Sequence, residues 1–168
     1  GIPPPIAYDR RARRCLCGLN LDPENMITHI RGCSRLNGEQ YARHNKLRKV
    51  FQDLLALADY VHTHEPMPWK YAAGDFDAAT RAMRTDLAAT HFSSQDQKQY
   101  DVSIVTTGAV DHVRRAARVA GSEIEKIEKV KIRKYGANCQ RIGYKFVPLI
   151  FNTFGTWGKK MKIEINML

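Results

Sequence analysis

The sequence predicts an α/β domain built on a mixed sheet, preceded by a small module that needs a metal ion to fold. Three observations support this prediction. The expected elements follow the order helix, strand, hairpin, helix, strand, which is typical of a mixed-sheet α/β or α+β domain. Hydrophobic residues make up 43% of the chain and charged residues 26%, as in folded domains that bury a core. Three of the four cysteines fall within 19 residues near the N-terminus.

The length of the chain, 168 residues, suffices for one domain and a small satellite module, and it excludes a large multidomain enzyme. The first residue is glycine, so we expect an excised piece of a longer protein. No apolar run approaches the roughly 18 residues needed to cross a bilayer, and no signal sequence opens the chain. We therefore expect an intracellular protein without a membrane partner. The sequence leaves its oligomeric state open.

Residues 1–14 predict an extended basic arm. Three consecutive prolines near the start favour an extended linker, and four arginines follow, Arg10, Arg11, Arg13 and Arg14. Clustered arginines on an extended segment are suited to contacts with phosphates.

Residues 15–38 contain too few large apolar side chains to form a core unaided. The pattern C-x-C-x11-H-x3-C places Cys15, Cys17, His29 and Cys33 in this segment. Thiolates and an imidazole are the ligands of a tetrahedral structural zinc ion, which supplies the folding free energy that such a segment lacks. The last two ligands are four residues apart and can share one face of a helix. The segment is therefore predicted to be a CCHC zinc site.

Other cysteines and histidines allow alternative ligands. His44 is a rival fourth zinc ligand. Cys139 stands alone and is expected to be a buried apolar residue, and His62 and His64 are expected to be strand residues. Disulfides are not expected in an intracellular protein.

The remaining chain, 39–168, forms the predicted main domain. Apolar residues recur at steps of three and four between Glu39 and Tyr60, which predicts an amphipathic helix. Val61–Pro66 is predicted to be a short strand, and 70–83 a loop with one helical turn. Two β-like runs, Asp86–Phe92 and Tyr100–Thr107, are joined by a polar stretch and predict a hairpin.

A helix is predicted over 111–135, with a break at Gly121 and a new start at a capping box formed by Ser122 and Glu125. The continuous apolar run Phe146–Phe154 follows it. Such a run predicts a buried central strand.

The predicted hairpin brings two carboxylates together. If its turn is centred at Ser93 and Ser94, Asp86 lies directly opposite Asp101. Directly opposed like charges are destabilising, so the pair calls for a cation. Mg²⁺ prefers such oxygen ligands and also binds phosphate oxygens. The alternative is that the two aspartates are an unrelated surface residue and strand residue.

A lysine interrupts the apolar face of the predicted long helix. On a helical wheel Lys131 falls in the sector of Ile124, Ile127 and Tyr135. A lysine on an apolar face is costly unless it meets an anion, and the alternative is that its side chain extends outward to solvent. If Lys131 reaches the sheet edge, then two carboxylates, a metal ion and a lysine form a phosphodiester-cleaving site.

Charge is distributed unevenly along the chain. The formal net charge of +10 divides into +6 over residues 1–50, −3 over 51–100 and +7 over 101–168. Basic flanks around an acidic centre suit an enzyme that neutralises phosphates and holds a cation. A basic solvated surface without a partner is the alternative.

Five motifs occur in a fixed order along residues 15–158. They are Cys-x-Cys-Gly with His-x-x-x-Cys, Tyr-Ala-Arg43-His44-Asn45-Lys-Leu-Arg48, Arg84-Thr85-Asp86 with Asp101 after fourteen residues, Lys131-x-x-x-Tyr135, and Phe146-Val-Pro-Leu-Ile-Phe-Asn-Thr-Phe-Gly155. Together they resemble the zinc knuckle and the restriction-endonuclease-like domain at the C-terminal end of site-specific non-LTR retrotransposon proteins. The pattern departs from the family at Thr85, where proline is usual, and at Ser103, where lysine is usual.

The resemblance implies a PD-(D/E)xK nuclease core that nicks target DNA with Mg²⁺ or Mn²⁺ and leaves a 3′-hydroxyl for the element's reverse transcriptase. Asp86 and Asp101 would be metal ligands and Lys131 the catalytic lysine, and Glu65 and His44 are candidates to complete the site. Implied partners are target DNA, an upstream reverse transcriptase domain and element RNA, in the nucleus. Residues expected to contact nucleic acid are Arg10, Arg11, Arg13, Arg14, Arg43, His44, Lys129, Arg133 and Lys134.

Two other classes of function are open on the sequence. The first is an inactive nuclease-like platform that binds nucleic acid or protein. The second is a zinc-dependent protein-interaction domain, which would leave the net charge of +10 unexplained.

Overall fold

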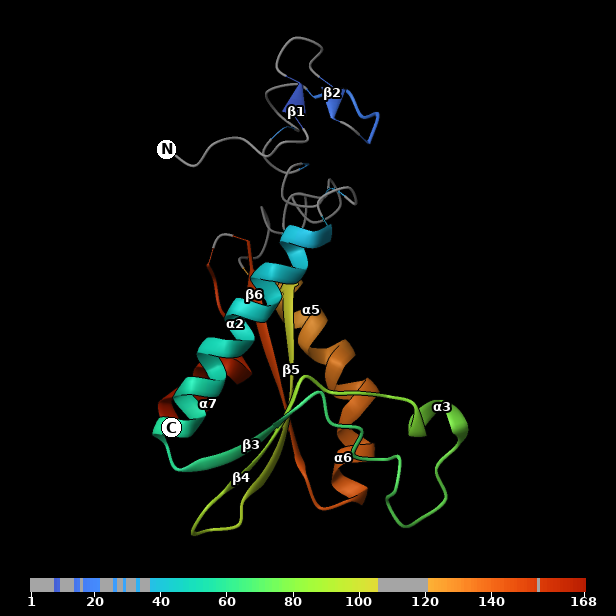
Figure 1. Ribbon diagram of the computed structural model, residues 1–168, viewed down its shortest axis with the longest axis vertical. Coiled ribbons are helices and arrows are strands. Elements are labelled where there is room, and N and C mark those ends of the chain that lie inside the picture. The colour runs from blue at the N-terminus through green and yellow to red at the C-terminus, as the bar shows by residue number, and fades with distance from the viewer. Residues whose placement is uncertain are drawn as a thin grey trace.

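A four-stranded mixed sheet forms the centre of the main domain (Figure 1). The computed structural model describes residues 8–9, 14–15, 17–21, 26, 29, 33, 37–105, 121–153 and 155–168. The sheet has the order β3 (Tyr60–His64), β4 (Leu87–His91), β5 (Gln97–Val105) and β6 (Lys145–Asn152). The first three strands are antiparallel neighbours, and β6 runs parallel to β5. This confirms the predicted mixed-sheet α/β fold.

Helices cover both faces of the sheet. One face packs against α2 (Asn37–Leu57) and α7 (Lys159–Met167). The other face packs against α5 (Ser122–Lys131), the π-helical turn η2 (Ile132–Gly136) and α6 (Ala137–Arg141). Figure 1 shows α2 and α5 on opposite sides of β5. The short helix α3 (Ala78–Arg81) lies in the connection between β3 and β4.

Alternation along β5 decides which helices its side chains meet. Tyr100 and Val102 belong to the core with Phe51 of α2, whereas Val105 packs with Ile124 of α5. Successive strand residues point to opposite faces. Asp101 is therefore directed toward the α5 side of the sheet.

The sequence predicted that the run Phe146–Phe154 is a central strand. In the structure, β6 lies at an edge of the described sheet instead. Its residues Leu149 and Ile150 are nevertheless 0% exposed. Helices on both faces bury these side chains. The apolar run therefore indicates that helices cover the strand, not that the strand is central in the sheet. Pro148 lies in this strand and lacks an N–H, which an edge position tolerates.

The predicted capping box of α5 is wrong. The N-cap residue is Gly121, with a φ of 79°, and no side chain caps the helix. Ser122 Oγ donates to Glu123 Oε1 instead, at 3.3 Å. The positive φ explains the glycine, because side chains are strained in that region. The predicted helical residues 111–120 lie outside the described residues.

A buried polar cluster fixes α7 to the sheet. The Glu164 carboxylate of α7, 2% exposed, accepts hydrogen bonds from Lys98 Nζ and Tyr100 Oη, both at 2.8 Å. Burial lowers the pKa of Lys98, but the hydrogen bond and charge of Glu164 outweigh it, so this pKa lies above its ordinary value. Burial also raises the pKa of Tyr100, together with the negative charge of Glu164.

Substitution of Glu164 by alanine is expected to lower the free energy of unfolding by about 3–5 kcal/mol, because it leaves a buried lysine without its main anion. Urea unfolding followed by circular dichroism measures this change. Glu164→Gln keeps an acceptor for Tyr100 and should cost less. A loss below about 1 kcal/mol for Glu164→Ala would show that the cluster does not hold α7 in place.

Candidate functional site

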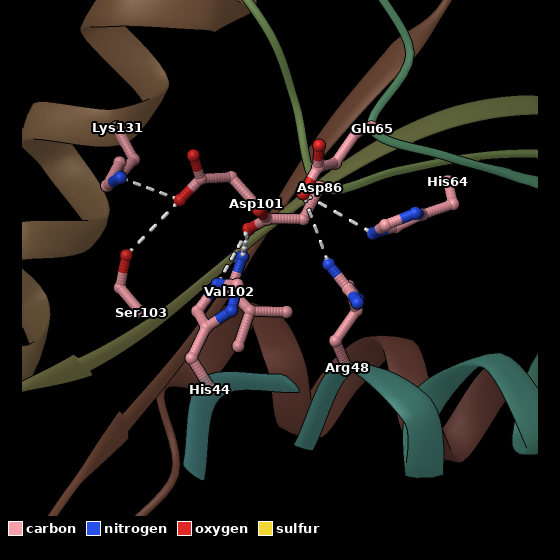
Figure 2. Close-up of polar contacts among 9 residues, drawn as sticks. All are labelled: His44, Arg48, His64, Glu65, Asp86, Asp101, Val102, Ser103 and Lys131. Carbon is pink, nitrogen blue, oxygen red and sulfur yellow. Dashed lines mark hydrogen bonds and ion pairs between the residues drawn. The ribbon is translucent and has the colours of Figure 1, made fainter. Parts of the chain in front are cut away.

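The side chains of Asp86 and Asp101 are neighbours at the point where β4 and β5 separate (Figure 2). The ladder pairs Leu87 with Tyr100, in the predicted register, and ends there. Beyond it, Asp86 N donates to Tyr100 O at 2.9 Å. The Asp86 carboxylate accepts a 2.6 Å hydrogen bond from Val102 N. Because the β4–β5 ladder ends here, the Val102 N–H has no backbone partner on β4, and the Asp86 side chain accepts its hydrogen bond instead.

Lys131 of α5 contacts Asp101. The lysine Nζ lies 2.7 Å from Asp101 Oδ2, and Ser103 Oγ donates to the same oxygen at 3.2 Å. Asp101 is only 6% exposed, and the Lys131 side chain is 24% exposed. Asp101 is therefore the anion that the sequence predicted for Lys131 on the apolar face of the helix. The catalytic role of Lys131 stays a prediction.

The turn η2 directly follows Lys131 and places Tyr135 beside the pair. Lys131 Nζ lies 5.9 Å from the centre of the Tyr135 ring. Burial raises the pKa of Tyr135 to about 12, helped by the negative charge of Asp101. π-helical turns occur frequently at functional sites.

His44 of α2 lies on the other side of Asp86. Its Nε2 is 3.3 Å from Asp86 Oδ2 (Figure 2). The hydrogen bond with Asp86 raises the pKa of His44 and outweighs the opposing effect of burial. His44 thus contacts a carboxylate of this site, whereas the cysteine cluster takes His29 as its fourth member.

The stability contributed by the contact between His44 and Asp86 should depend on pH. Because the folded pKa of His44 is raised, protonated His44 stabilises the fold fully below its unfolded pKa, about 6.5, and this contribution is lost as pH rises through the folded pKa. His44→Gln should therefore lower the Tm more at pH 5.5 than at pH 8. Thermal melts of both proteins at the two pH values measure this. An equal loss at both would contradict the assignment.

Glu65 lies next to Asp86, and its carboxylate contacts two arginines and a histidine. Its backbone N donates to Asp86 O at 3.0 Å, and its φ is 45°. Its carboxylate lies 3.5 Å from Arg48, 3.5 Å from His64 and 3.9 Å from Arg84. A non-glycine residue in this conformation is strained, and such strain occurs at functional sites. The structure brings Glu65 close to Asp86 through its backbone.

Whether a divalent cation fits depends on which oxygens of Asp86 and Asp101 already have protein partners. The contacts of Val102, His44, Ser103 and Lys131 all fall on the Oδ2 atoms of the two aspartates. The Oδ1 atoms take none of these four contacts, and Asp101 also hydrogen-bonds with the Tyr135 side chain. Carboxylate oxygens are the donors that Mg²⁺ or Mn²⁺ prefers.

The four predicted zinc ligands form a second site. The donor atoms of Cys15, Cys17, His29 and Cys33 all lie within 4.8 Å of one another. The two buried thiols, of Cys15 and Cys33, are 3.5 Å apart, and Cys17 Sγ is 3.3 Å from His29 Nε2. A tetrahedral zinc ion with Zn–S near 2.3 Å separates its ligand atoms by about 3.6–3.8 Å. The cluster could therefore hold a structural zinc ion.

The surroundings of the cluster affect the pKa values of its thiols and pair its first residues with a short strand. A hydrogen bond with the backbone of Leu19 lowers the pKa of Cys17, which favours the thiolate. Burial raises the pKa of Cys15. The strands β1 (Tyr8–Asp9) and β2 (Arg14–Cys15) pair antiparallel, so these residues of the predicted arm pair with the start of the cluster.

The basic residues predicted to contact nucleic acid are scattered. Arg14 is exposed and donates to Asn20 Oδ1, Arg43 is partly buried on α2, and Lys129 pairs with Glu125 at 2.7 Å. Arg133 and Lys134 are exposed, the latter 4.6 Å from the Tyr135 ring centre. The predicted residues Arg10, Arg11 and Arg13 lie outside the described residues.

Arg48 was included in a sequence motif but was given no role, and Ser103 was misjudged. Arg48 lies four residues after His44 on α2, a spacing that places both on one helix face and could have revealed its place in the site. Ser103 was noted only as a missing lysine. Its position two residues after Asp101 puts it on the same face of β5, where its hydroxyl reaches the carboxylate.

No protein-family model and no curated protein matches the chain. Among the described residues, no helix has the length and apolar character needed to cross a membrane. The structure supports a mixed α/β fold and a Cys/His cluster that could hold a metal ion. The family resemblance and its activity stay predictions.

Proposed function

We propose that the chain is a divalent-metal-dependent DNA endonuclease that nicks target DNA and leaves a 3′-hydroxyl for target-primed reverse transcription of a non-LTR retrotransposon. One observation supports the proposal most strongly. Asp86 and Asp101 lie together where two strands separate, and a lysine from the covering helix lies 2.7 Å from Asp101. Two carboxylates and a lysine gathered where the inner strands β4 and β5 separate are groups that can support phosphodiester hydrolysis.

Asp86 and Asp101 would hold the divalent cation, with Glu65 as a further candidate. When bound, the cation supplies Lewis acidity toward the scissile phosphate and a lower pKa for the attacking water. Lys131 would place a positive charge beside a phosphate oxygen where negative charge develops. Val102 N and Ser103 Oγ hold the two carboxylates in place.

The remaining basic residues would position DNA through its phosphates. The zinc knuckle, the arginines of the N-terminal arm and the exposed lysines and arginines of α5 and η2 would bind the backbone without reading bases. In the full-length protein the partners would be target DNA, an upstream reverse transcriptase domain and element RNA, in the nucleus.

Nicking of supercoiled plasmid in Mg²⁺ or Mn²⁺ tests the proposal directly. The wild-type chain should convert supercoiled plasmid to open circles only when the metal is present. The nick should prime a DNA polymerase without phosphatase treatment, because the proposed product ends are a 5′-phosphate and a 3′-hydroxyl. A nick that cannot be extended would contradict the proposed chemistry.

Binding to duplex DNA should weaken steeply as salt rises. Each phosphate neutralised by a lysine or arginine contributes about −0.9 to the slope of log K against log [salt] for duplex DNA. Fluorescence anisotropy with a labelled duplex between 50 and 200 mM salt measures this slope. A slope near zero would count against every function that depends on phosphate contacts.

An inactive binding platform is the second candidate, and one observation favours it. Both aspartates already accept protein hydrogen bonds or ion pairs at Oδ2, and Lys131 neutralises Asp101. A chain that binds DNA with a strong salt dependence but cuts with neither metal would favour this platform.

A further inference from the structure

A hollow between α5 and the start of α7 lies outside the candidate site. Its volume is about 600 Å³, and its lining combines apolar side chains with six charged ones. α5 contributes Ile124 and Glu128 to it, while Trp157 and the first residues of α7 close the other side. Volumes of this size accommodate small organic ligands. Lys131, the lysine of the candidate site, is not among its lining residues.

Trp157 presents a fixed aromatic surface at this hollow. The residue is 42% exposed, although it bridges to Phe151 of β6 through the backbone. The two rings pack edge to face with their centres 6.3 Å apart. One side of the indole is therefore supported by the sheet while a large area stays accessible. A supported, accessible indole is a platform on which an unstacked base can lie.

Positive charge surrounds the hollow. Its charged lining residues are Glu125, Glu128, Lys129, Lys159, Lys160 and Lys162. Lys129 pairs with Glu125 at 2.7 Å. The three lysines of α7 are exposed. With Lys129 and Glu125 paired, these three positive charges outnumber the single negative charge of Glu128. Lysines beside an aromatic platform are complementary to a ligand with a flat ring and phosphates.

The base of the hollow is built by a close approach of two elements. Glu128 Oε1 accepts a hydrogen bond from Lys160 N at 3.0 Å, and the residue is only 5% exposed. A Cβ at Gly158 would lie 2.2 Å from the same oxygen, so the glycine is needed for this approach. The contact fixes the first turn of α7, and with it the lysines, relative to α5.

We propose that this hollow binds single-stranded nucleic acid, with one base stacked on Trp157 and the adjoining phosphates held by Lys159, Lys160 and Lys162. A single strand is favoured over a duplex because only an unstacked base exposes its face to the indole. The inference goes beyond the proposed nuclease activity and holds whether or not the chain cuts DNA.

Tryptophan fluorescence tests the proposal without any cleavage. The chain has two tryptophans, and Trp69 is 0% exposed, so an added ligand reaches Trp157 selectively. Titration of the whole chain with a 20-residue oligothymidylate, at low salt and without added Mg²⁺ or Mn²⁺, should quench the emission. The matching duplex should quench it much less.

Variants separate the stacking contact from general charge. Trp157→Ala should weaken binding of the oligothymidylate, measured by anisotropy, by about 5- to 150-fold, the range that corresponds to the stacking of one base. Trp157→Phe keeps a ring and should lose less. Lys162→Gln should reduce the salt slope by about 0.7, whereas Lys126→Gln, on exposed α5 surface outside the hollow, should reduce it less.

Several results would overturn the proposal. One is unquenched emission with the oligothymidylate at low salt. Another is equal affinity of wild type and Trp157→Ala when circular dichroism shows both folded. A third is quenching by polyglutamate or anionic lipid vesicles but not by the oligonucleotide, which would assign the hollow to a different partner. Plasmid nicking is scored separately, so failure of the nuclease leaves this result readable.

Discussion

Asp101→Asn is expected to abolish metal-dependent plasmid nicking, and Lys131→Met to slow it by at least about 100-fold. Asp101 would hold the cation, and an amide has no negative charge with which to bind it. Lys131 lies 2.7 Å from Asp101 and would lose its charge in the variant without a large change in size. Rates from a time course at saturating Mg²⁺ measure both effects.

Lys49→Met is the matched control. Lys49 lies on α2, is exposed and pairs with Asp53 across one helical turn. Its replacement removes the same charge and should change the nicking rate by less than a few fold, because exposed i, i+4 pairs contribute only about 0.3–0.5 kcal/mol. Affinity for duplex DNA should stay within a few fold in all three variants.

Equal activity in wild type, Asp101→Asn and Lys131→Met would point to a contaminating nuclease and remove the support for the site. Loss of activity together with loss of folding would be uninformative about chemistry, so the Tm of each variant is measured first. Asp101→Asn keeps an oxygen that accepts from Ser103, which limits the structural cost.

Local patterns predicted the parts of the structure that depend on neighbours in sequence. The polar stretch between two β-like runs fixed the hairpin register, and the observed pairing of Leu87 with Tyr100 agrees with it. Helical periodicity placed Lys131 on the apolar side of α5, where it meets Asp101. The spacing of Cys15, Cys17, His29 and Cys33 predicted their proximity. In each case a short-range rule determines which side chains meet.

Features that depend on distant contacts were not predictable in this way. The parallel pairing of β6 with β5 joins residues 47 positions apart, such as Asp101 and Pro148, and no local pattern specifies it. The helix α7 was not foreseen, because the contact of Glu164 with Lys98 of β5 joins residues 66 positions apart and no local pattern specifies it. The exact partner of Asp86 was also missed. The predicted opposition to Asp101 is replaced by a bond to Val102 N, since the ladder ends one residue earlier.

Removal of zinc is expected to unfold the N-terminal cluster while the sheet domain stays folded. Only three buried residues, Cys15, Leu21 and Cys33, form the described core of the cluster, and Met26 packs against them. So small a core supplies little hydrophobic free energy, whereas structural zinc contributes about 10–16 kcal/mol in small peptides. The sheet has its own core around Phe51, Tyr100 and Leu149.

Cys15→Ser should therefore lose the metal, about one zinc per wild-type chain by elemental analysis, and should make residues 15–33 sensitive to limited proteolysis. The main unfolding transition should change little. Cys139→Ala serves as the control, because Cys139 is 0% exposed and burial raises its pKa to about 12, which disfavours the thiolate that zinc needs. His44→Gln should also retain zinc, since His44 contacts Asp86. Protein purified without added zinc that contains none, yet resists proteolysis in this segment, would show that the cluster folds without a metal.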